Sequence, residues 1–293
     1  MTEIISITQD FVKNQVKARY AKCKKGDNGI VLVIGGSSLY HGAPLLASLA
    51  ALRAGVDLVY TAVPKTIIDP IRSYSPNIIA LPMADNSLTI GSTNRLIKSM
   101  PKIPNTASIG MGMTVSRTEA LILLVKKLRD SGTRLVLDAS ALIPRIVEEI
   151  RETDTIITPH PGEFKRIFNE DVGASEKEMM TTASRMATKY KITIILKGWI
   201  NIVADQSGKV AAIKRSTPAM TVGGTGDVLA GLVAALYCKI NSSFVASALS
   251  VYFNGLAARI ATDQVGLHMV ATDLIENLPK VIKQFDKISH YKI

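Results

Sequence analysis

The chain has 293 residues, 47% of them hydrophobic, which is enough for a large buried core and argues against a disordered protein. The 35 Lys and Arg residues exceed the 24 Asp and Glu residues, so the net charge is +11 and acidic ligands such as phosphates are favoured. Because the basic residues are scattered and only 5% of residues are aromatic, the composition argues against a nucleic-acid groove, and we expect no nucleic-acid partner.

The cysteines and the apolar segments indicate the compartment. Cys23 and Cys238 have no Cys or His at metal-ligand spacing, so we predict free thiols in a reducing compartment, not a disulfide or a zinc site. The N-terminal stretch MTEIISITQDFVKNQ lacks the basic and apolar regions of a signal peptide. The longest strongly apolar segment that we identify, residues 228–238, is shorter than the roughly 20 residues that span a bilayer. We therefore expect a cytoplasmic protein without a membrane partner.

Short β-branched runs, each followed by a helix-like segment, recur along the first two thirds of the chain. Several are apolar without alternation, as expected of strands covered on both faces. Helix-like segments between them, such as residues 44–55 and 117–132, end in Gly and carry basic residues late. This alternation predicts a three-layer α/β/α fold with a mostly parallel central sheet. The predicted strands lie within residues 30–36, 56–63, 77–82, 106–110, 134–139, 154–158 and 192–198.

The first glycine cluster, VIGGSSLYHGAP at residues 33–44, follows the first of these strands. It lacks the G-x-G-x-x-G spacing of a dinucleotide-binding loop. Two interpretations stay open: a strand-to-helix turn in which Gly35 and Gly36 relieve backbone strain, or a ligand-binding loop.

The pattern changes after Lys197. Residues 199–215 contain two short β runs divided by DQSG, which predicts a hairpin, and we expect antiparallel strands to cover that edge of the sheet. The remainder, from Asp227 to the end, has helical patterns. No repeat, low-complexity tract or long linker divides the chain, so we predict one domain over residues 1–293.

The segment GGTGDVLAG, residues 223–231, combines three glycines and an acid at the start of an apolar helix. The first N–H groups of a helix have no intrahelical partner, and Gly223, Gly224 and Gly226 let the backbone approach an anion closely. The aligned amides and the helix dipole would stabilise a phosphate there. Asp227 is placed to take a proton from a hydroxyl that attacks a phosphoryl group. An acid in the first turn also stabilises a helix by itself, but such a cap requires no glycine.

The GGTGD run resembles the signature of the ribokinase-like superfamily, in which the glycines form an anion hole and the aspartate is the catalytic base. Other segments narrow the resemblance: GSSLYHGAPLLASLAALRAG at residues 36–55, TPHPGEFKRI at residues 158–167 and ILKG at residues 195–198. Their order and approximate spacing are similar to those of the ADP- or ATP-dependent NAD(P)H-hydrate dehydratases. This similarity extends over nearly the whole chain, from Gly26 onward.

The resemblance implies the substrate and the reaction. The substrate would be the S form of hydrated NADH or NADPH (NADHX or NADPHX), a damaged cofactor with a hydroxyl at C6 of its nicotinamide ring. ADP or ATP would phosphorylate this hydroxyl, and loss of phosphate and a proton would restore NAD(P)H. Mg²⁺ would neutralise the nucleotide phosphates. Related dehydratases are commonly homo-oligomers. The sequence does not choose between ADP and ATP, or between the two hydrates.

The same resemblance implies roles for individual residues. Asp227 would contact the substrate and activate its hydroxyl as the catalytic base. The anion hole and the nucleotide site would be formed by Lys197, Gly198, Trp199, Ile200, Asn201, Gly223, Gly224, Thr225 and Gly226. The hydrated cofactor would contact Ala43, Gly110, Gly112 and His160.

Three residues also have a structural interpretation. His160 stands between two prolines, which makes it a rigidly presented loop residue, but a lone histidine is often structural. Glu163 fits either a cap of the helix after Pro161 or a water-mediated magnesium contact. Lys197 fits either a nucleotide contact or a surface lysine at a strand end.

The chain departs from the family pattern at three places. The family usually has G-P-G-L-G where residues 110–114 are GMGMT, and D-A-D where Asp138, Ala139 and Ser140 stand. Asn201 replaces the threonine commonly found after the Lys-Gly pair. These changes concern the acceptor more than the phosphoryl chemistry.

Two other functions fit part of the pattern. The same base and anion hole would serve an ATP-dependent kinase of a small alcohol, such as a hydroxyethylthiazole- or hydroxymethylpyrimidine-like substrate. The charge of +11 also fits a non-catalytic nucleic-acid-binding or ligand-binding protein. The similarity over nearly the whole chain favours the dehydratase.

Overall fold

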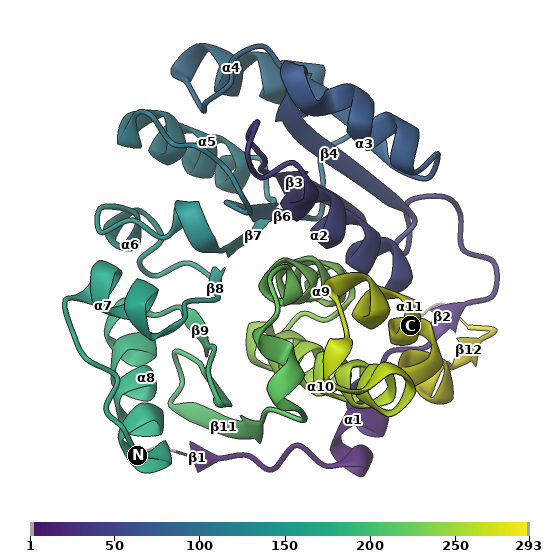
Figure 1. The fold of residues 1–293 in the computed structure, drawn as a ribbon, viewed down its shortest axis with the longest axis vertical. Helices are drawn as coiled ribbons and strands as arrows, with labels where there is room; N and C mark the ends of the chain where they lie inside the picture. Colours follow the sequence, from purple (N-terminus) through teal and green to yellow (C-terminus); the bar gives the residue numbers. More distant parts are fainter. Residues whose placement is uncertain (1–2, 292–293) are drawn as a thin grey trace.

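The computed structural model describes residues 3–291 and contains one continuous ten-stranded sheet (Figure 1). Across the sheet the strands follow the order β1 (Glu3–Ile4), β11 (Lys209–Lys214), β10 (Ile200–Ala204), β9 (Thr193–Leu196), β8 (Ile156–Ile157), β7 (Arg134–Leu137), β6 (Thr106–Ile109), β3 (Ile30–Ile34), β4 (Leu58–Pro64) and β5 (Ile79–Met83). Every neighbouring pair is parallel except β9 with β10 and β10 with β11. The predicted mostly parallel sheet and its antiparallel hairpin are therefore confirmed.

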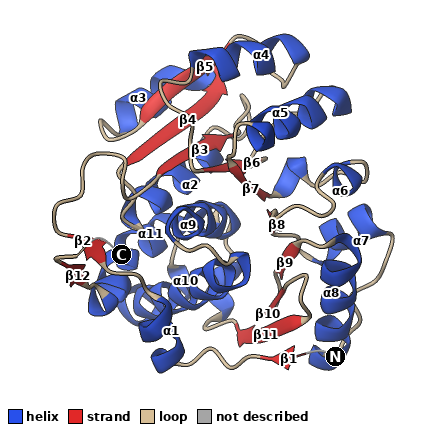
Figure 2. Ribbon diagram, turned by 180° about the vertical axis from the view of Figure 1, so that it is seen from behind, coloured by secondary structure: helices blue, strands red, loops and turns tan. Residues whose placement is uncertain are grey.

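Helices cover both faces of the sheet, as Figure 2 shows by the blue helices on either side of the red strands. One layer contains α1 (Gln9–Gln15), α2 (Gly42–Arg53), α3 (Ile68–Tyr74), α9 (Thr225–Lys239) and α10 (Ser243–Val265), with α11 (Ala271–Ile282) packed on α2, α9 and α10. The other layer contains α4 (Ile90–Ser99), α5 (Thr118–Asp130), α6 (Ile146–Glu149), α7 (Pro161–Phe168) and α8 (Glu176–Tyr190). The predicted three-layer α/β/α architecture is present.

The apolar runs of the sequence form strands because both faces of the sheet are covered. In β3, Val31 and Val33 belong to the hydrophobic core on the α9 side, whereas Ile30, Leu32 and Ile34 belong to the core on the α5 side. Successive side chains of a strand point to opposite faces, so a strand between two helix layers needs apolar residues at every position.

Two short strand pairs were not predicted. β1 pairs in parallel with β11 and is the outermost strand at the hairpin edge of the sheet. We expected antiparallel strands at this edge, so this strand differs from the prediction. In a separate two-stranded sheet, β2 (Arg19–Tyr20) pairs in parallel with β12 (Ile288–Ser289), which corrects the expectation that the chain is helical after Asp227. Strands of two residues have no measurable periodicity, and only their distant partners define them.

α10 is a longer apolar segment than residues 228–238, which the sequence analysis took as the longest. Together with the following turn it extends over Ser243–His268, 26 residues that are long and apolar enough to cross a membrane by length and composition. However, 67% of its most apolar window is buried inside the protein, where α10 packs against α9 and α11. This burial is typical of a core helix.

The first glycine cluster forms the turn from β3 to α2. Gly36 has φ +82°, and a Cβ atom on Gly35 would lie 2.3 Å from the carbonyl oxygen of Met111. These observations support the strand-to-helix turn, because neither position accepts a side chain without strain.

The closest helix contact lies between α2 and α9. A Cβ atom on Gly231 of α9 would lie only 2.0 Å from the carbonyl oxygen of Ala47 in α2, so the two backbones touch at this point. Gly231 therefore fixes how deeply α9 is seated.

We predict that Gly231→Ala destabilises the protein by about 2 to 4 kcal/mol, because the helices must separate to admit the methyl group. Gly255→Ala is the matched control inside α10, since its nearest new contact would be 3.9 Å away and alanine favours the helix. Thermal unfolding of both variants measures the effect, and a melting temperature of Gly231→Ala equal to that of the control would contradict this account.

Candidate active site

The carboxyl ends of three adjacent strands bring the charged residues of the site together. Asp138 follows β7, Thr158 follows β8 and Lys197 follows β9. Parallel strands end at the same edge of the sheet, where α/β proteins bind ligands. The first turn of α9 lies at the same place, since a Cβ atom on Gly226 would be 3.5 Å from Lys197 Nζ.

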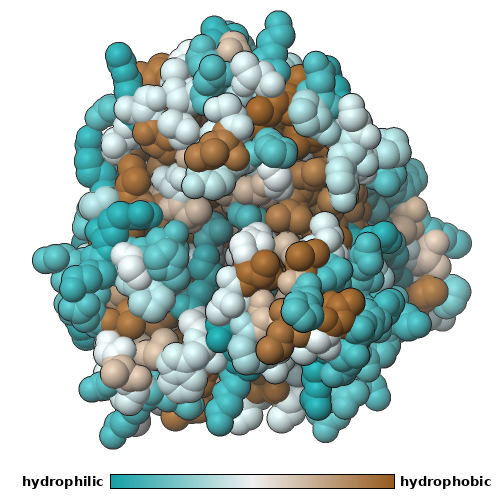
Figure 3. Space-filling model, in the orientation of Figure 1, coloured by the Kyte–Doolittle hydropathy of each residue, from teal (hydrophilic) through white to brown (hydrophobic). Residues whose placement is uncertain are grey.

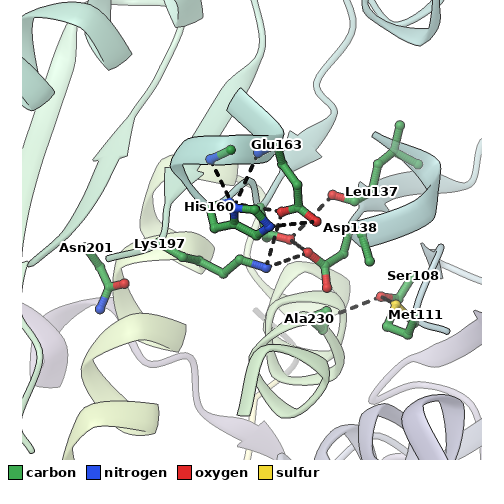
Figure 4. Close-up of polar contacts among 12 residues, drawn as sticks. Ser108, Met111, Leu137, Asp138, His160, Glu163, Lys197, Asn201 and Ala230 are labelled. Atoms are coloured by element: carbon green, nitrogen blue, oxygen red, sulfur yellow. Dashed lines mark hydrogen bonds and ion pairs between the residues drawn. The ribbon is translucent and has the colours of Figure 1, made fainter. Parts of the chain in front are cut away.

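Asp138 and Lys197 form an ion pair in which Asp138 is buried and Lys197 is partly buried. Lys197 Nζ lies 2.7 Å from Asp138 Oδ1, which also accepts a 2.7 Å hydrogen bond from Thr158 Oγ1 (Figure 4). Asp138 is only 2% exposed, and the Lys197 side chain is 19% exposed. Although burial opposes its charge, the Asp138 and Glu163 carboxylates hold the pKa of Lys197 above its ordinary value. The surface-lysine interpretation of Lys197 is therefore wrong, and its contact with a nucleotide stays a prediction.

The start of α9 leaves its first backbone amides without a side-chain cap. Gly224 is the N-cap residue, with φ +95°, and among the described residues no side chain caps the helix start by a hydrogen bond. A Cβ atom on Gly224 would also lie 2.6 Å from Leu46 Cδ1, so a glycine is required here by both conformation and packing. Thr225 Oγ1 donates to the carbonyl oxygens of Met220 and Val222, which holds the loop in place. Open amides at a fixed helix start are suited to an anion.

Asp227 stands in the first turn of α9 and is partly buried. Burial and the nearby Asp138 carboxylate raise the pKa of Asp227 to about 7, although Lys197 acts in the opposite direction. A carboxyl group with a pKa near neutrality can accept a proton effectively at neutral pH.

His160 and Glu163 together cap α7. Nδ1 of His160 accepts hydrogen bonds from the amides of Gly162 (3.0 Å) and Glu163 (3.3 Å), and Glu163 Oε2 accepts one from the His160 amide (2.9 Å). The capping interpretation of Glu163 is thus what the structure contains. Glu163 Oε2 also lies 3.9 Å from Lys197 Nζ, so it adds negative charge beside the ion pair. Within residues 3–291, no cluster of three or more His, Cys, Asp or Glu side chains could hold a metal ion.

The residues expected at the hydrated cofactor lie on the neighbouring loops. A Cβ atom on Gly112 would be 3.1 Å from Ala43 Cβ, so these two residues are adjacent. A Cβ atom on Gly110 would be 1.9 Å from the carbonyl oxygen of Asp138, which places Gly110 beside the ion pair. Both glycines have positive φ, +121° for Gly110 and +61° for Gly112. The loop backbone here can therefore approach a ligand closely.

A cavity of about 250 Å³ adjoins the ion pair and the start of α9. Its lining includes six residues of the predicted site: His160, Lys197, Gly198, Asn201, Thr225 and Gly226. The sequence analysis missed Pro161, Arg215, Met220, Leu229, Val251 and Asn254. Figure 3 shows hydrophilic atoms near the centre of this face and a group of hydrophobic atoms toward α9 and α11.

Several predicted residues do not line this cavity. Trp199 is 52% exposed, whereas Ile200 is 1% exposed and belongs to the core of the sheet. Asp227, Gly223 and Gly224 stand at the start of α9 but do not line the cavity. Ala43, Gly110 and Gly112 do not line it either. Of the six predicted residues that line the cavity, five belong to the predicted nucleotide side of the site, and His160 belongs to the predicted cofactor side.

The fold is that of the ribokinase-like superfamily. A ribokinase-like protein of Enterococcus faecalis, 20% identical, superposes with a TM-score of 0.79 over 98% of this chain and 97% of that one. The family model for NAD(P)H-hydrate dehydratase matches residues 31–280. The ADP-dependent (S)-NAD(P)H-hydrate dehydratase of Nitrosopumilus maritimus is 44% identical over 283 residues, which cover 97% of this chain and 98% of that protein.

A solved structure agrees with these matches. The ADP/ATP-dependent NAD(P)H-hydrate dehydratase of Bacillus subtilis, co-crystallised with ATP and Mg²⁺, is 28% identical and superposes with a TM-score of 0.83, covering 95% of this chain and 98% of that one. The chain belongs to the NAD(P)H-hydrate dehydratase family, and the resemblance seen in its sequence is confirmed.

The raised pKa of Asp227 predicts that its carboxylate destabilises the protein at neutral and higher pH. An unfolded aspartate has a pKa of about 3.9, so between about pH 4 and pH 7 the folded chain binds more protons and stability falls as the pH rises. Asp227→Asn should raise the free energy of unfolding by roughly 1 to 2 kcal/mol at about pH 8 and by little at about pH 4. Urea unfolding at both pH values measures this difference. Asp69→Asn, a control with an 87% exposed side chain, is measured at the same two pH values.

Removing one partner of the Asp138–Lys197 pair leaves a buried charge. Lys197→Met should lower the free energy of unfolding by about 3 kcal/mol. Adding Asp138→Asn should recover part of this loss, because the remaining carboxamide is neutral. Denaturant unfolding of the four chains gives the coupling energy between the two residues. Strictly additive losses would show that the two side chains do not depend on each other.

Proposed function

We propose that this protein is an ADP/ATP-dependent (S)-NAD(P)H-hydrate dehydratase, an enzyme that repairs hydrated nicotinamide cofactors. The observation that carries this function is the 44% identity to an ADP-dependent (S)-NAD(P)H-hydrate dehydratase over 97% of the chain. The site supports the chemistry independently, since it combines open helix amides, a partly buried ammonium and a carboxyl group with a pKa of about 7.

The reaction follows from the groups at the α9 start. Asp227 accepts the proton of the C6 hydroxyl of the hydrated nicotinamide ring while the hydroxyl oxygen attacks the terminal phosphoryl group of ADP or ATP. The rest of the nucleotide leaves as AMP or ADP. The lone pair of the ring nitrogen then expels the phosphate from C6. Loss of a proton from the neighbouring carbon restores NAD(P)H, and the hydroxyl oxygen leaves in inorganic phosphate.

The other residues position the two substrates. The amides of Gly224, Thr225 and Gly226 would hold the transferring phosphoryl group, and Lys197 would supply positive charge beside it. The remaining nucleotide contacts would come from Gly198, Trp199, Ile200, Asn201 and Gly223, and the hydrated cofactor would lie against Ala43, Gly110, Gly112 and His160. Neither Trp199 nor Ile200 lines the cavity, so their contacts with a nucleotide would come from the backbone or, for Trp199, from its exposed side chain.

The oxygen atoms of the site suit a Mg²⁺ ion that is bound together with the nucleotide, and not one that the protein holds by itself. Mg²⁺ is commonly bound by one or two carboxylates together with waters and substrate phosphates, and when bound it neutralises the phosphate charge. The described residues supply no dedicated cage, but Glu163 Oε1 and Asp138 Oδ2 accept no hydrogen bond there from the protein. We propose that Glu163 contacts the ion through water.

The kinase of a small alcohol is the weaker alternative. The same base and amides would serve any hydroxyl acceptor. However, the matching family model describes NAD(P)H-hydrate dehydratases, and the Nitrosopumilus maritimus relative is named as one. A homo-oligomeric state, a cytoplasmic location and the absence of nucleic-acid and membrane partners stay predictions from the sequence, and sedimentation analysis would measure the first.

The test is incubation of the protein with NADHX or NADPHX and ADP or ATP in the presence of Mg²⁺, followed by the absorbance of regenerated NAD(P)H. Asp227→Asn should bind nucleotide but lose about 10²-fold to 10⁴-fold or more in kcat, because it cannot accept the proton. For the wild-type enzyme, kcat/KM should fall about tenfold per pH unit below about pH 7, as Asp227 becomes protonated. Asp69→Asn should retain full activity. Phosphorylation of a small alcohol without any NAD(P)H signal would overturn the proposal in favour of the kinase.

A further inference from the structure

Asn254 is a buried polar residue that the proposed mechanism does not use. It lies on α10 and is 3% exposed, and its Oδ1 atom has no hydrogen-bond partner among the described residues. A buried carbonyl without a partner costs about 1 to 3 kcal/mol, so such groups usually have a reason to persist. Asn254 also lines the cavity beside the start of α9. Oδ1 itself is closed to solvent, so a ligand in the cavity would supply the missing donor after a small rotation of the Asn254 side chain.

The surroundings of Asn254 indicate the shape of that ligand. Met220, Leu229 and Val251 line the same cavity. Leu229 lies one turn after Thr225 and Gly226 on the same face of α9, and Val251 lies one turn before Asn254 on the same face of α10. The cavity thus combines an anion-binding helix start with apolar side chains and one unpaired amide. A nucleoside phosphate has the matching parts, since its base is a flat apolar body with a polar edge.

The cavity lies mainly among the residues expected at the nucleotide. Its lining contains Lys197, Gly198 and Thr225 of the expected nucleotide site. Of the four residues expected at the hydrated cofactor only His160 lines it, whereas Ala43, Gly110 and Gly112 lie outside. We infer that Asn254 recognises the base of the nucleotide, with Oδ1 accepting a hydrogen bond from the exocyclic amine of adenine. Asn is well matched to adenine, because its carboxamide can accept from the amine and donate to a ring nitrogen at the same time. The inference rests on the proposed binding of nucleotide phosphates at the start of α9.

Ser247 provides a matched comparison on the same helix. Its Oγ atom is the other buried side-chain atom without a partner among the described residues, and Ser247 is fully buried. Unlike Asn254, Ser247 does not line the cavity. Ser247→Ala therefore removes an unpaired polar atom from α10 without altering the proposed base contact.

The experiment measures nucleotide affinity directly and does not depend on turnover. Isothermal titration in the presence of Mg²⁺ compares ADP, the 5′-diphosphate of unsubstituted purine riboside, which lacks the exocyclic amine, and pyrophosphate. The wild-type protein and Ser247→Ala should bind ADP about tenfold or more tighter than the purine analogue. Asn254→Leu should bind the two nucleotides equally, and pyrophosphate as well as the wild type does. Asn254→Ser serves as a second variant in case leucine disturbs the packing, and thermal unfolding checks that both fold.

The outcomes separate this inference from the proposed function. An Asn254 variant that folds and still prefers ADP to the purine analogue overturns the inference, whatever its activity. A wild-type protein that binds neither nucleotide, or both equally, also overturns it. If the preference for ADP depends on Asn254 but NAD(P)H is never regenerated from the hydrate, the inference stands and the proposed function fails.

Discussion

The ion pair between the buried Asp138 and the partly buried Lys197 is the interaction on which the arrangement of the site depends. The two residues follow β7 and β9, and Thr158 from the strand between them donates to the same carboxylate. Two charges are stable out of water only when each is paired and hydrogen-bonded. The parallel register of three strands provides this condition. The pair fixes an ammonium group beside the first turn of α9 and leaves a carboxylate close enough to raise the pKa of Asp227.

α9 makes this edge of the sheet a candidate anion site because its first turn is open and its body is buried and closely packed. Its residues 228–237 are all buried, and Gly231 brings its backbone against that of α2. Gly224 seats the first turn against Leu46 and Ala271. Amides held in this way need no reorganisation when an anion binds, which is the property that makes fixed dipoles effective in catalysis.

The groups of the site oppose the stability of the fold. The Asp227 carboxyl is held where ionisation is unfavourable, and Asn254 Oδ1 is buried without a hydrogen-bond partner among the described residues. Both features destabilise the protein, and both lie at or near the carboxyl edge of the strands. The two hydrophobic cores, one on each face of the sheet, compensate for them.

The sequence by itself determined the series of buried parallel strands, the hairpin of residues 199–215 and the glycine-rich helix start with Asp227. These features depend on neighbouring residues, whose periodicity and turn chemistry are visible along the chain. Only the tertiary structure decided that Lys197 pairs with Asp138, 59 residues away, that Glu163 and His160 cap one helix, and that Asn254 of α10 faces the cavity. It also decided the pKa of Asp227, because burial and a neighbouring charge depend on segments that only folding brings together.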